Sequence, residues 1–190
     1  MKALKILLGL FLLAGLFCTQ VFAQEPTHWN KNMLLVYMPE GNEYTPMMSK
    51  AFIEWEGKFA RKIQFIQTTF ERDVRLAEIE VKFNQVSGEE AKNSGSTVLT
   101  GQTNTYRHGT ITINTLYNEE IEKDPAKKAK NDAEIYRIML HEVGKVMGLP
   151  SSENPQSVMN DKIVDGQTIL QEDIDKVYEL YGWRARGRVK

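Results

Sequence analysis

The chain has 190 residues, with 24 Lys and Arg side chains against 25 Asp and Glu, and a formal charge of −1 at pH 7. This balance provides no basic excess to neutralise phosphates, so no nucleic-acid partner is expected. A hydrophobic share of 42% and a charged share of 26% are typical of a folded domain and exclude wholesale disorder. A single cysteine excludes an internal disulfide framework and any zinc site with several thiolates.

The first 23 residues predict a secretory signal peptide. Lys2 and Lys5 precede an apolar run over 6–18, which is the order of a charged and then a hydrophobic signal region. Val21-Phe22-Ala23 then places small residues at the −3 and −1 positions of a cleavage site before Gln24. We therefore expect export followed by cleavage at this point.

A lipoprotein anchor at Cys18 is the alternative, but Phe17 puts a bulky side chain where that signal needs a small one. The apolar run is short for a bilayer span and no second long run follows, so no membrane span is expected. We expect a secreted protein, in the periplasm or the medium, with one domain over 24–182 and a basic tail over 183–190.

The chain after the signal peptide alternates between strand and helix patterns. Short apolar or alternating runs predict strands, and apolar residues at three- and four-residue spacing predict helices. The expected strands are 33–38, 63–66, 79–83, 97–106 and 110–114, with a loop over 87–96 and a turn at His108-Gly109. The expected helices are 45–59, 132–148 and 171–180, with a solvated loop over 123–132, which could include one helical turn, before the second helix.

One segment, from His141 to Met159, carries the residues for chemistry. On a helix, His141 and position 145 project from the same face one turn apart, which is the spacing of a metal chelate. Glu142 stands beside the first ligand, where a carboxylate can take a proton from a metal-bound water. Gly148 allows the chain to turn sharply and to carry residue 151 back toward the same point.

This layout resembles H-E-x-x-H-x-x-G-x-x-H followed by a Met-turn, the signature of the metzincin zinc proteases, with Met159 as the Met-turn residue. Other stretches are similar, in the same order, to the matrixin catalytic domain. They are Trp29 with the strand at 34–37, Tyr44-Thr45-Pro46 leading into Ala51-Phe52 and Trp55, Ala77 to Phe83, Gly109 to Asn114, and Gln171 to Gly182.

The resemblance covers nearly all of 29–182. It implies an α+β fold, with a twisted, mixed and mostly parallel five-stranded sheet, two long helices and a small C-terminal subdomain carrying a third helix. It also implies zinc as the cofactor, Glu142 as the general base and a peptide or protein as the molecule in the cleft. The loop 87–96 has no histidine for a second zinc, and calcium held by backbone carbonyls leaves no sequence signal.

Two positions depart from the family pattern. Lys145 stands at the second zinc-ligand position and Ser151 at the third, so His141 is the only retained ligand. A protease zinc needs three protein ligands and an open position for water. Lysine must first lose a proton from an ordinary pKa of about 10.4 before it can coordinate. The Lys145 ammonium could instead take the place of the metal and pair with Glu142, or extend into solvent.

Three functional classes stay open on the sequence, which carries no signal for the oligomeric state. The expected class is a pseudoprotease whose cleft binds a peptide or protein without cutting it. The second is an active zinc endopeptidase with a substitute ligand such as Glu153, Asn154 or Asp161, and the third is a purely structural secreted domain. The remaining histidines, His28 and His108, are expected at the surface or in caps and not as ligands.

Overall fold

The computed structural model of the protein describes residues 27–102 and 104–183. The predicted signal peptide, its cleavage site and nearly all of the basic tail lie outside the described residues. The elements are β1 (Met33–Tyr37), α1 (Thr45–Gly57), β2 (Gln64–Thr68), a 3-10 turn (Glu71–Asp73), β3 (Ile79–Val86), β4 (Ser94–Gln102), β5 (Thr105–Leu116), α2 (Glu119–Lys123), α3 (Pro125–Val146) and α4 (Gln171–Leu180).

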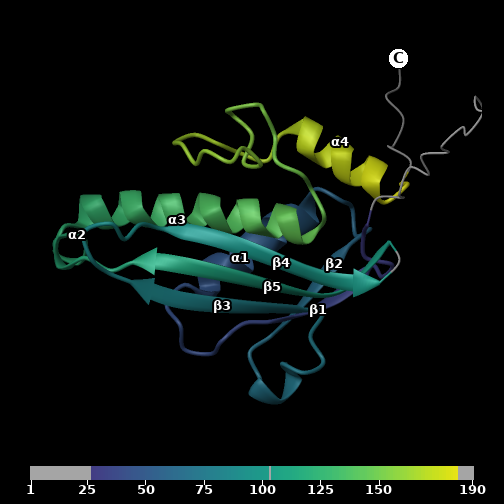
Figure 1. Ribbon diagram of the computed structural model, residues 1–190, viewed down its shortest axis with the longest axis horizontal. Helices are drawn as coiled ribbons and strands as arrows, with labels where there is room; N and C mark the ends of the chain where they lie inside the picture. Colours follow the sequence, from purple (N-terminus) through teal and green to yellow (C-terminus); the bar gives the residue numbers. More distant parts are fainter. Residues whose placement is uncertain (1–26, 103, 184–190) are drawn as a thin grey trace, which may run out of the picture.

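The strands form one sheet in the order β2-β1-β3-β5-β4 (Figure 1). The first four strands in that order run parallel to their neighbours, whereas β4 runs antiparallel to β5 at the edge. The predicted α+β fold with a mixed, mostly parallel five-stranded sheet is therefore confirmed. Helix α3 packs beside this antiparallel edge strand.

Helices α1 and α3 pack against each other and against the sheet, and together they bury its inner face. Strand residues that point to this face, such as Val81 and Ile113, are fully buried or nearly so. The buried Trp55 of α1 donates from its indole Nε1 to the backbone oxygen of Leu140 in α3 at 2.8 Å. This contact fixes α3, the helix that carries the candidate site, against the rest of the core.

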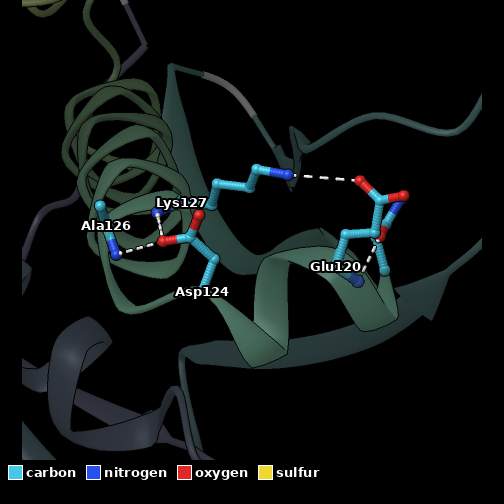
Figure 2. A network of polar contacts seen from close by, with 5 residues as sticks. Glu120, Asp124, Ala126 and Lys127 are labelled. Carbon is cyan, nitrogen blue, oxygen red and sulfur yellow. Dashed lines mark hydrogen bonds and ion pairs between the residues drawn. The ribbon is translucent and has the colours of Figure 1, made fainter.

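Helix α3 begins earlier than the sequence pattern predicted, so the expected loop over 123–132 is wrong. The side chain of Asp124 accepts hydrogen bonds from the backbone N–H groups of Ala126 and Lys127, and Pro125 occupies the first turn (Figure 2). Both features stabilise a helix start. The first turns of α3 are mostly exposed, so they have no apolar stripe that would predict a helix. The sequence signal for this helix start was Asp124 followed by Pro125.

The hairpin between β4 and β5 also differs from the prediction. Strand β5 runs unbroken through His108-Gly109, so the expected turn at these residues is wrong. The chain instead reverses near Asn104, whose φ is +59°, and β4 begins within the expected loop 87–96. Gly109 lies inside this strand. A Cβ there would come within 2.9 Å of Val146 Cγ2 on α3, which explains why the position holds a glycine.

A connection over 147–170 leads from α3 to α4, which lies beyond the C-terminal part of α3 (Figure 1). This part is the predicted small subdomain with a third long helix, and the short α2 is a helix that the sequence pattern did not predict. Within 27–102 and 104–183, no helix is both long and apolar enough to cross a membrane.

Candidate functional site

A cleft of about 440 Å³ lies between the edge strand β4 and helix α3. His141, Glu142 and Lys145 of α3 line one wall, as their spacing on the helix requires. Gly95 of β4 lines the opposite wall, and Asp161 closes the cleft from the connection that follows α3. The structure therefore brings together the first two ligand positions of the motif and its carboxylate.

His141 is held in one orientation by a partner from the Met-turn. The side chain is 6% exposed, and Nδ1 lies 2.9 Å from the backbone oxygen of Val158. A carbonyl oxygen can only accept a hydrogen bond, so Nδ1 carries a proton, and Nε2 is the nitrogen that has the lone pair in the neutral ring. The ring of His141 is thus oriented so that Nε2 could serve as a metal ligand, the arrangement usual for metal-binding histidines.

Glu142 is held by the edge strand. Thr97 Oγ1 donates to Glu142 Oε2 at 2.6 Å, and the side chain is 4% exposed. Gly95 makes room for this side chain, because a Cβ at that position would lie 2.6 Å from Glu142 Cγ. Of the two alternatives for Lys145, the ion pair with Glu142 is absent from the ion pairs formed within 27–102 and 104–183.

Ser151, at the third ligand position, is exposed and donates a hydrogen bond from Oγ to Asp161 Oδ1 at 2.5 Å. Asp161 lines the cleft, so the carboxylate nearest to the missing third imidazole is already bonded to a hydroxyl. Of the substitute ligands considered from the sequence, Asp161 is the one that lines this cleft.

Gly148 ends α3 and turns the chain toward Ser151. Its φ is +95°, a left-handed conformation that side chains disfavour. A Cβ at this position would also lie 2.9 Å from Leu180 Cδ2 and 3.2 Å from the backbone oxygen of Thr27. Backbone conformation and close packing therefore both require glycine here.

Met159 lies beneath α3 and is 1% exposed. The turn that carries it is fixed to α4, because Met159 N donates to Ser157 Oγ at 2.9 Å. The same hydroxyl donates to the buried carboxylate of Asp173, with both oxygen atoms at 2.8 Å. Asp173 thus connects the turn that carries Met159 to α4.

The site also depends on residues that the sequence analysis did not single out, namely Gly95, Thr97 and the Val158 carbonyl. Gly95 and Thr97 lie more than forty residues from Glu142, so no local spacing marked them. Val158 contributes only its backbone, which leaves no residue-type signal. Neither His28 nor His108 lines the cleft.

The donor set does not fit the zinc that the resemblance implies. Among the described residues, 27–102 and 104–183, no group of three or more His, Cys, Asp and Glu side chains is placed to hold a metal ion. A catalytic zinc requires three protein ligands. His141 supplies one, whereas the ammonium of Lys145 repels a divalent cation.

Comparison with models of protein families identifies a match for most of the chain. The model of the matrixin family, peptidase family M10, matches residues 33–182, which include every strand and long helix described above. No curated protein matches the chain.

Proposed function

The chain belongs to the matrixin family, and we propose that it is a secreted pseudoprotease, which binds a peptide or protein segment in its cleft without hydrolysing it. The observation that carries this proposal is the donor set of the cleft. One imidazole remains, and the two other ligand positions hold a lysine and a serine.

The chemistry of water explains why this donor set disfavours hydrolysis. Zinc lowers the pKa of a bound water from 15.7 to about 7, which generates a nucleophile near neutral pH. Glu142 has no such water to deprotonate unless a metal is held beside it. Its carboxylate instead accepts a hydrogen bond from Thr97. The residues that remain can position a peptide, but they supply no activated nucleophile.

The cleft retains features that suit peptide binding. Strand β4 is the edge of the sheet, and its free side offers unpaired backbone groups to an added extended segment. The cleft is lined by apolar side chains such as Ile138 and Ile163 together with charged groups from both walls. Such a mixture is typical of sites that bury a peptide side chain while orienting it.

An active zinc endopeptidase is the second candidate, and the position of Asp161 in the cleft favours it. A carboxylate at this point could replace the third imidazole if Ser151 released it. The second position remains the difficulty, because Lys145 lies one helical turn from His141 and would have to coordinate as the neutral amine.

Secretion is part of the proposal. Residues 1–23 have the charge and apolar pattern of a signal peptide, and the domain over 24–182 would be released after cleavage. The N-terminal sequence of the protein recovered from culture tests this directly, with Gln24 as the expected first residue.

The proposed function is tested on the unmodified protein by metal analysis and by digestion of casein and gelatin with and without 1,10-phenanthroline. We expect zinc far below one ion per chain and no cleavage that the chelator inhibits. Stoichiometric zinc with chelator-sensitive cleavage would instead establish the endopeptidase. A protein that neither cleaves nor binds peptides would be a structural domain.

A further inference from the structure

A second pocket, of about 300 Å³, continues the cleft toward the N-terminal part of α3. The two cavities share Lys92, Asn93 and Glu134 in their walls, so a peptide in the cleft can reach both. Leu116 at the end of β5 and Ile121 of α2 give the pocket an apolar floor. This floor suits an aliphatic part of a ligand.

The rim of this pocket is basic. Lys92, Lys127 and Lys130 line it, against one carboxylate from Glu134. Lys127 is partly neutralised, because its Nζ lies 3.3 Å from Glu120 Oε2 (Figure 2). Lys92 and Lys130 are exposed and take part in none of the ion pairs within the described part of the chain. The pocket is therefore positive on a chain whose overall charge is slightly negative.

The inner wall contains a donor without an acceptor. Asn131 is 6% exposed, and its Oδ1 accepts a hydrogen bond from Asn93 Nδ2 at 2.7 Å. Its Nδ2 has no hydrogen-bond partner among the residues that the structure describes. This nitrogen is itself covered by protein atoms. An unsatisfied buried donor is costly, so a shift of the wall that brought it against a ligand oxygen would remove the cost.

We propose that this lysine-rimmed pocket receives an acidic side chain, flanked by aliphatic residues, from the peptide that occupies the cleft. The carboxylate would lie between Lys92 and Lys130 and the neighbouring aliphatic groups against Leu116 and Ile121. Charge complementarity selects the acidic group, because the pocket wall has three ammonium groups and one carboxylate. This inference rests on the proposed function, since it names the chemistry of the peptide bound at the same cleft.

The test measures fluorescence anisotropy with three pools of rhodamine-labelled peptides. Each pool has one fixed central tripeptide, Leu-Glu-Leu, Leu-Gln-Leu or Leu-Lys-Leu. The flanking positions are randomised in the same way in all three pools. We expect the Glu pool to bind about three- to ten-fold more tightly than the Gln pool, and the Lys pool to bind most weakly, as two partly exposed ion pairs imply. The double variant Lys92→Gln with Lys130→Gln should bring the Glu and Gln pools to equal affinity.

The matched control replaces two lysines that line neither cavity, Lys58→Gln with Lys176→Gln, and should keep the preference for the Glu pool. Equal binding of all three pools to the unmodified protein would overturn the acidic preference and leave the proposed function standing. A preference that survives in the Lys92 and Lys130 variant would also overturn it. If no pool binds at all, the proposed function itself fails.

Discussion

Gly144 of α3 and Met159 of the Met-turn are in such close contact that no side chain fits between them. A Cβ at position 144 would overlap the sulfur of Met159 and would lie 3.0 Å from Trp55 Cζ2. Both neighbours are buried, so neither can move into solvent to make room. The missing side chain at this glycine is therefore what allows Met159 to pack directly against the helix that carries His141.

The first prediction is that Gly144→Ala destabilises the protein. Overpacking costs about 1–3 kcal/mol, and the better helix propensity of alanine returns about 1 kcal/mol, so we expect a net loss of up to about 2 kcal/mol in the free energy of unfolding by urea. In a Met159→Ala background the same change should be neutral or stabilising, because the overlapping sulfur is gone. Equal costs in both backgrounds would show that the contact is not responsible.

The second prediction concerns Asp173, which fixes the Met-turn to α4. Its carboxylate accepts from Ser157 Oγ and from the backbone N–H of Leu170 at 2.9 Å, and it is fully buried. Asp173→Ala should lower the free energy of unfolding by about 2–4 kcal/mol, because a helix cap and a buried charged hydrogen bond are lost together. Asp175→Ala, on the exposed side of the same helix, should change it by less than about 0.5 kcal/mol.

The third prediction separates conformation from packing at Gly148. Gly148 and Gly166 both have positive φ, of +95° and +84°, but a Cβ at Gly166 would meet nothing within 4 Å. Gly166→Ala should therefore cost only the backbone term of about 1–2 kcal/mol. Gly148→Ala should cost at least about 1 kcal/mol more in thermal or urea unfolding, since it adds the contact with Leu180. Equal costs would mean that the surrounding residues relax freely.

The sequence predicted the sheet because its signals are local. Alternation in β3 and helical spacing in α1 report directly on which side chains are buried, and both elements lie where they were expected. The family resemblance, now confirmed over 33–182, supplied the number of strands in the sheet and their mostly parallel direction, which no local pattern contains. The start of α3 was missed because its exposed first turns have no apolar stripe, although Asp124 and Pro125 together signalled a cap.

In the candidate site, too, the sequence predicted local placement but not the contacts between distant segments. The motif correctly placed His141, Glu142 and Lys145 on one wall, because a helix fixes the spacing of its own residues. The pairing of Lys145 with Glu142, one of two alternatives, does not form, and the hydrogen bond that Glu142 accepts comes from Thr97, on a strand far away in the sequence. Contacts across the sheet edge depend on strand register, which local residue patterns specify only weakly.

The fourth prediction is that the protein loses the stability contributed by the Glu78 carboxylate when the pH is lowered. Burial opposes the ionised form, but the Lys31 ammonium and the Leu35 N–H, at 2.5 and 2.7 Å, outweigh it and lower the pKa of Glu78 below 4.5. A lowered pKa means that its contribution is present above the unfolded value, near pH 4.5, and is lost as the pH falls through the folded value. Glu78→Gln should cost about 0.5–1 kcal/mol near neutrality after solvent screening.

The measurement for Glu78 is urea unfolding as a function of pH. The curves of the Glu78→Gln variant and the unmodified protein should begin to converge as the pH falls below the unfolded pKa of the carboxyl group. They should meet below its lower folded pKa, because the wild-type side chain is then neutral in both states. A difference that stays constant down to the acid limit would assign the effect to packing and not to charge.

The last prediction is that Lys145→His with Ser151→His restores a zinc site. His141 already bonds the Val158 carbonyl through Nδ1, Gly148 already turns the chain, and Met159 already packs against α3, so only two imidazoles are missing. The variant should bind zinc and unfold at higher urea in its presence, by about 2.7 kcal/mol when free zinc is a hundred times its dissociation constant. Adding His141→Ala should abolish this gain, and EDTA should reverse it. Zinc that stabilises the unmodified protein equally would show that the present donor set is sufficient, and the pseudoprotease assignment would then be wrong.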